Sequence, residues 1–174
     1  MRRLIDQFEA GFVRLLTALA ALVAISIALI ALGIPLNLLL VKLQWGSIWW
    51  MYEAVEYALY VGVFIAAPWV LRQGSHVRID VLTANLPRGL AVRLEQALDL
   101  VGSALCVALC VYGTRAAIWE FEDGTLPDKD LRIANWYMLA VFAVSFLLLA
   151  VEFLLRMRRA VDLTDPESSS KAGF

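Results

Sequence analysis

The sequence is poor in the residues that bind metals and carry out catalysis. It contains one histidine, His76, and two cysteines, Cys106 and Cys110. A bis-histidine haem needs a second histidine and a structural zinc site needs about four Cys or His ligands, so neither is expected within this chain. Cys106 and Cys110 lie four positions apart in an apolar segment, which favours small packing residues on one helix face over a disulfide. No nucleophile is paired with a base, so we expect neither an enzyme nor a cofactor.

The sequence is also poor in charge. Charged residues make up 18% of the chain, against about 25% in an average soluble domain. The formal net charge of −1 gives no reason to expect a nucleic-acid partner. Hydrophobic residues make up 61%, and a globule of 174 residues is too small to bury that excess. The composition therefore predicts an integral membrane protein.

Four apolar runs are each long enough to cross a bilayer, which takes roughly 20 helical residues. They cover about residues 15–40, 48–71, 98–119 and 133–155. The first run follows basic residues, as in a signal peptide, but it is too long for one and no cleavage site follows, so we expect a retained helix. The predicted fold class is all-α: one domain of four transmembrane helices over residues 1–160, then a polar, disordered tail over 161–174.

The basic residues predict how these helices are oriented, because cytoplasmic segments carry an excess of lysine and arginine. If the N-terminus is cytoplasmic, all but four of the 15 basic residues fall on the inner side. Five of the six tryptophans then fall at the outer boundary, where aromatic belts occur. We therefore predict that both termini are cytoplasmic and that the protein is a multi-pass protein of a bacterial inner membrane.

Three acidic residues lie in or beside the apolar runs. Glu53 and Glu56 are three residues apart near the outer end of the second run, and Asp99 begins the third. Ionisable groups inside a membrane suggest an ion path. The alternative, which we favour, is that Glu53 and Glu56 lie near water or bond to another helix, and that Asp99 is solvated or paired.

The third run carries a stripe of small residues at every fourth position: Gly102, Cys106, Cys110 and Thr114. Small side chains let two helices approach closely in lipid. We therefore expect a helix-packing seam rather than a substrate channel.

The stretch LRQGSHVRID, residues 71–80, surrounds the only histidine and leads into the connection over residues 72–93. Apolar and basic residues alternate in it, which is typical of a segment lying in the membrane interface on the cytoplasmic side. Arg88 and Arg93 are expected to bind lipid headgroups at the start of the third helix. Asp80 either orients His76 or pairs with Arg78, and with no partner for catalysis the stretch is interpreted as a structural junction.

The stretch EAVEYALYVGVFIAAPWVLRQGSHVRIDVL resembles the signature of the small membrane subunit of tripartite ATP-independent periplasmic (TRAP) transporters. The later NLPRGL and the fourth run with its Trp-Tyr start are similar to the same family, and four spans of this length match it over nearly the whole chain. The positions that carry the signature are Glu53, Arg72, Gly74, His76, Arg78 and Asp80.

The resemblance implies a scaffold role in a sodium-coupled secondary transporter that takes up organic anions. The small subunit would bind the large membrane transport subunit, which holds the substrate and sodium sites, and help dock a periplasmic substrate-binding protein. The acidic stretch from Glu120 to Asp130 is a candidate contact for that protein, although solvation explains its charge equally well. Two alternatives stay open: the small subunit of a tricarboxylate-type tripartite system, and a membrane anchor of a redox complex.

Overall fold

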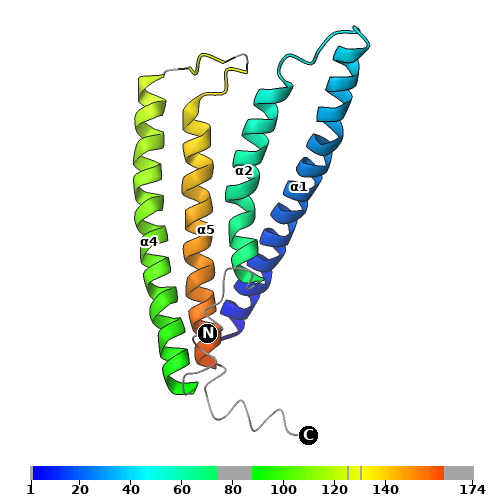
Figure 1. The fold of residues 1–174 in the computed structure, drawn as a ribbon. Coiled ribbons are helices and arrows are strands. Elements are labelled where there is room, and N and C mark those ends of the chain that lie inside the picture. The colour runs from blue at the N-terminus through cyan, green and yellow to red at the C-terminus, as the bar shows by residue number, and fades with distance from the viewer. Residues whose placement is uncertain (1, 74–87, 125, 130, 163–174) are drawn as a thin grey trace, which may run out of the picture.

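A computed structural model describes residues 2–73, 88–124, 126–129 and 131–162. This part of the chain forms four long helices (Figure 1): α1 (Arg2–Lys42), α2 (Met51–Arg72), α4 (Arg88–Asp123) and α5 (Asn135–Asp162). Each contains an apolar window long enough to span a membrane. The predicted fold class, an all-α protein with four membrane-spanning helices, is confirmed.

Two helices extend well beyond the apolar runs that predict them. α1 begins at Arg2 rather than near residue 15, and α4 begins at Arg88 rather than near residue 98. Residues 88–93, which the sequence analysis places in the interfacial connection, are therefore the start of α4. Hydropathy detects only the part of a helix that lies in lipid, and both extensions are rich in charge.

The helices stand side by side in an open row, in the order α1, α2, α5, α4 (Figure 1). The most extensive contact is between α4 and α5, followed by those of α2 with α1 and with α5. A closed bundle would bring α1 against α4, whereas in the row these two helices form the outer edges. The row therefore has two broad faces and two free edges.

We call the end where α1 and α4 begin the terminal end, and the opposite end the far end. α1 lies against its neighbours at the terminal end and diverges from α2 toward the far end (Figure 1). Phe12 and Leu16 of α1 are buried against Leu155 of α5, with Trp69 of α2 packed beside them. This small apolar cluster fastens α1 to the rest of the row.

The helix ends follow from local backbone chemistry. α1 ends in two hydrogen bonds, from Gln44 N to Val41 O and from Trp45 N to Leu40 O, which together form a Schellman cap. Gln44 takes the left-handed conformation there, with φ of 57°. α4 ends at Asp123 and is followed by Gly124, where a φ of 67° favours glycine.

Many large apolar side chains of the described helices are exposed, above all on α1 and α4, for example Leu32 at 72% and Tyr112 at 68%. A water-soluble protein does not expose apolar surface on this scale. The faces of the row must therefore be covered by lipid or by another membrane protein.

Candidate functional site

Four charged side chains meet at the terminal end and join three helices. Arg72, the last residue of α2, lies 3.3 Å from Glu152 of α5 and 3.5 Å from Glu9 of α1. Arg159 of α5 contacts the same two carboxylates, at 3.0 Å from Glu9 and through a hydrogen bond to Glu152. We call these residues the four-charge cluster; its two positive and two negative groups balance.

The sequence brings each member of the cluster to this place for a physical reason. Glu9 precedes Phe12 and Leu16 by one and two helical turns, so one face of α1 presents both the carboxylate and the apolar anchor. Glu152 and Arg159 are two turns apart on α5 and face the same side. Glu152 is fully buried, with each oxygen bound by a different arginine. A carboxylate buried this deeply is tolerated only when it is paired in this way.

A second ion pair at the terminal end joins the last helix of the row. Asp99 of α4 is 4% exposed, and its Oδ1 lies 3.5 Å from Nε of Arg156 on α5. Of the two expected alternatives for Asp99, solvated or paired, the structure shows the paired one. Charge pairs thus connect every helix to the row at this end.

In the middle of the row, α2 and α5 are joined by a hydrogen bond that a proline makes necessary. Pro68 has no N–H, so the carbonyl of Phe64, one turn earlier in α2, has no helical donor. The hydroxyl of Ser145 on α5 donates to that carbonyl instead. Tyr60 adds a second link through its hydroxyl, which donates to the carbonyl of Met138 at 3.3 Å.

The α4–α5 seam is built on glycines that admit aromatic rings. A methyl group at Gly102 would lie 3.0 Å from the ring of Phe153, and one at Gly113 would lie 2.7 Å from the ring of Phe142. Both positions therefore require a very small residue. Ser103 donates a hydrogen bond of 3.5 Å to the carbonyl of Ala150 across the same seam.

The predicted stripe of small residues coincides with this seam only in part. Gly102 and Cys106 face α5, and Cys106 is buried. Cys110 is half-buried, whereas Thr114 is exposed and bonds to the Cys110 carbonyl of its own helix. A strict four-residue spacing drifts around a helix of 3.6 residues per turn, so Thr114 leaves the seam and Gly113 takes its place.

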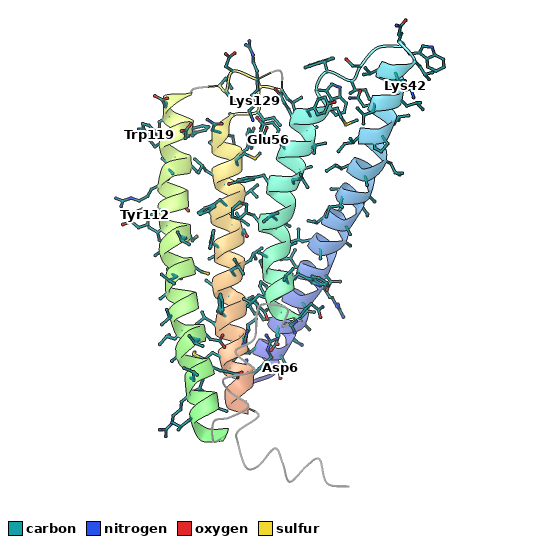
Figure 2. All side chains as sticks on the ribbon, viewed as in Figure 1. Asp6, Lys42, Glu56, Tyr112, Trp119 and Lys129 are labelled. Carbon is teal, nitrogen blue, oxygen red and sulfur yellow. The ribbon has the colours of Figure 1, made fainter. Side chains whose placement is uncertain are left out.

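At the far end, the start of α2 binds the connection between α4 and α5. Lys129 Nζ donates to both oxygens of Glu56 at 2.8 Å and lies 5.1 Å from the centre of the Tyr57 ring (Figure 2). Glu53 accepts a hydrogen bond from the N–H of Leu131. The hydrogen bond to Glu56 raises the pKa of Lys129 above its ordinary value. Both glutamates therefore bind the α4–α5 connection to the start of α2.

The other members of the predicted signature stretch fall mostly outside the described residues. This holds for Gly74, His76, Arg78 and Asp80. Of the six signature positions, Glu53 and Arg72 lie within the described residues: Glu53 at the start of α2 and Arg72 in the four-charge cluster. Arg88 begins α4, and Arg93, five residues later, is exposed. Lipid binding by Arg88 and Arg93 stays a prediction.

Sequence reasoning missed Glu9, Glu152 and Arg159, which complete the cluster around Arg72. Glu152 carried a usable signal, because it is an acidic residue within the predicted fourth span, residues 133–155. Within the described residues, no group of three or more His, Cys, Asp and Glu side chains is arranged to hold a metal.

These contacts are those of a membrane protein whose ionisable groups hold helices together. A comparison with protein families matches residues 43–163 to the family described as tripartite ATP-independent periplasmic transporters, DctQ component. The match includes α2, α4 and α5 and leaves out α1. No curated protein matches the chain. The chain belongs to the DctQ family and is therefore a small membrane subunit of a TRAP transporter.

Proposed function

We propose that this subunit is a non-enzymatic scaffold that binds the large membrane transport subunit and helps to dock the periplasmic binding protein. The transporter as a whole would take up an organic anion by sodium symport across the inner membrane. The substrate and sodium sites would belong to the large subunit.

The observation that carries the proposal is the open row. A helical protein that works alone in lipid gains from closing its helices into a bundle, because more side chains then pack against each other. In this chain α1 and α4 are separated by the two central helices, and both broad faces expose apolar side chains. An open row leaves helix surfaces uncovered on which a larger membrane protein can pack.

The placement of the ionisable groups also supports a scaffold. Glu152 and Asp99 are buried, but each has an arginine from its own or a neighbouring helix as partner. Glu56 is paired with Lys129 near the far end. A carboxylate already neutralised by arginine is a poor ligand for sodium or for a transported proton. The described helices therefore favour a holding role over an ion path of their own.

Docking of the binding protein is proposed for the far end. The connection between α4 and α5 is fixed there by Glu53 and Glu56, so it presents a fixed rather than a loose surface. This assignment requires the far end to face the periplasm, as the distribution of basic residues predicts.

Co-expression with a tagged large subunit tests the scaffold role. We expect the two chains to purify together in mild detergent, and the large subunit to lose yield when this chain is omitted. A large subunit that is equally abundant and stable without this chain would rule the scaffold role out.

A further inference from the structure

One edge of the row is the side of α4 that faces away from α5. Tyr112 and Trp119 lie on it and point away from the other helices (Figure 2), with exposed fractions of 68% and 65%. Arg115 lies three residues after the first and four before the second, so it shares their face and is exposed. We call this face the free edge of α4; its residues are Leu98, Val101, Leu105, Tyr112, Arg115 and Trp119.

Arg115 is a cation in an apolar surface and has no partner within the described part of the chain. No ion pair, hydrogen bond or ring contact is formed with it there. The arginines of the terminal end differ in this respect, because Arg72, Arg156 and Arg159 all contact carboxylates. Cations on membrane-spanning helices are usually paired, so an arginine that has no partner here is a candidate binding site.

The depth of Arg115 indicates where its counter-charge lies. The apolar stretch of α4 from residue 100 to Trp119 is about 30 Å long, the thickness of the hydrocarbon layer. Arg115 is one turn, about 6 Å, inside Trp119. Side chains on a helix lean toward its N-terminus, so the Arg115 side chain leans toward the middle of the membrane and away from the nearer headgroups.

An anion at the same depth suits this geometry better than a lipid phosphate. Phosphates lie beyond the aromatic belt that Trp119 marks. A carboxylate on a neighbouring transmembrane helix lies within the layer and accepts two parallel hydrogen bonds from the guanidinium group. Tyrosine, tryptophan and arginine are also the residues that contribute most to protein interfaces.

We propose that the free edge of α4 binds a transmembrane helix of the large transport subunit that carries an aspartate or glutamate facing Arg115. This inference rests on the proposed scaffold function and assigns it to one edge of the row. The partner helix is expected to be apolar along the contact except for that one carboxylate.

The test uses the full chain co-expressed with the tagged large subunit. Arg115→Gln should lower the yield of the complex about tenfold or more, because it leaves the partner's carboxylate unpaired in an apolar environment. Arg115→Lys keeps the charge and should recover part of the yield. Arg14→Gln is the matched control, since Arg14 is an exposed arginine on α1, at the other edge of the row. A photo-crosslinking residue at Tyr112 should also join the two subunits, and Arg115→Gln should weaken that adduct.

The outcomes separate this inference from the function on which it rests. A second photo-crosslinking residue at Leu29, an exposed position on α1, serves as the comparison. If the subunits purify together, Arg115→Gln has no effect and Leu29 gives an adduct while Tyr112 does not, the interface lies elsewhere and the inference is wrong. If Arg115→Gln lowers the phospholipid bound to an otherwise intact complex, the partner is a lipid headgroup and the inference is again wrong. If the subunits do not associate at all, the proposed function itself fails.

Discussion

The four-charge cluster leads to a quantitative prediction for Glu152→Gln. The substitution keeps the size of the side chain and removes one of the two negative charges. Arg72 and Arg159 would then share only Glu9, which Arg72 reaches at 3.5 Å and Arg159 at 3.0 Å. Two guanidinium groups would face one carboxylate in a largely buried site.

The expected cost is large because the lost charge is completely buried. Removing one partner of a buried ion pair typically costs about 3–5 kcal/mol. Glu9 remains to compensate part of the charge, so we expect a value near 3 kcal/mol. For a chain of this size, that corresponds to a fall in Tm of roughly 6–12 °C.

Thermal unfolding in detergent micelles measures this shift, and Asp6→Asn is the matched control. Asp6 lies at the same end of the row and pairs with Arg158 at 3.7 Å, but its side chain is 67% exposed. Exposed pairs contribute about 0–1 kcal/mol, so Asp6→Asn should lower Tm by no more than about 4 °C. Hydrogen exchange should increase in the terminal part of α1 for Glu152→Gln and not for Asp6→Asn.

A double substitution examines the charge argument itself. Glu152→Gln combined with Arg159→Gln leaves the neutral pair of Glu9 and Arg72. The double variant should therefore be more stable than the sum of the two single effects implies, by about 0.5–3 kcal/mol. Equal Tm shifts for Glu152→Gln and Asp6→Asn, or strictly additive effects in the double variant, would refute the reasoning.

Three further predictions concern the rest of the row. Gly113→Ala should destabilise the protein by about 1–3 kcal/mol in thermal unfolding, because the added methyl group would lie 2.7 Å from the ring of Phe142. Gly11→Ala is the control, since open space surrounds Gly11, and it should have no such effect. Equal effects of the two substitutions would contradict close packing at the α4–α5 seam. Ser145→Ala should lower the free energy of unfolding by roughly 0.6–1.7 kcal/mol. The loss should be clearly smaller in a Pro68→Ala background, because the Phe64 carbonyl then regains a helical N–H donor. An unchanged loss in that background would count against the proline explanation. The hydrogen bond to Glu56 raises the pKa of Lys129, so the contribution of this lysine to stability is complete below its ordinary pKa and is lost as pH rises through the raised value. The Tm difference between wild type and Lys129→Gln should therefore be present at pH 8 and vanish at strongly alkaline pH. A difference that persists at strongly alkaline pH would exclude the charged pair as its source.

The number of helices and the class of protein follow from the sequence because hydropathy reports directly on burial in lipid. The lengths of α1 and α4 do not, since their charged extensions leave the apolar layer. The order of the helices in the row also cannot be read from the sequence. It depends on which faces pack together, and a membrane helix is apolar on all sides, so its pattern does not mark the packed face.

In the candidate site, too, a residue marked by its local sequence could be predicted, whereas contacts between distant parts of the sequence could not. Arg72 could be selected from its position at the end of an apolar run and from the family signature. Its partners Glu9 and Glu152 are distant in sequence, and nothing local ties either carboxylate to an arginine of another helix. The stripe on the third run illustrates this too: a repeat at every fourth residue departs from the true helical period, so Thr114 belongs to the stripe although it is exposed.

If this chain is a scaffold, a working transporter requires it although the chain does not carry the substrate itself. Sodium-driven uptake into vesicles that contain the large subunit and the periplasmic binding protein, with and without this chain, tests it most directly. We predict that uptake requires this chain, while the affinity of the binding protein for its ligand is the same in both cases. Full uptake in vesicles that lack the chain would contradict the claim.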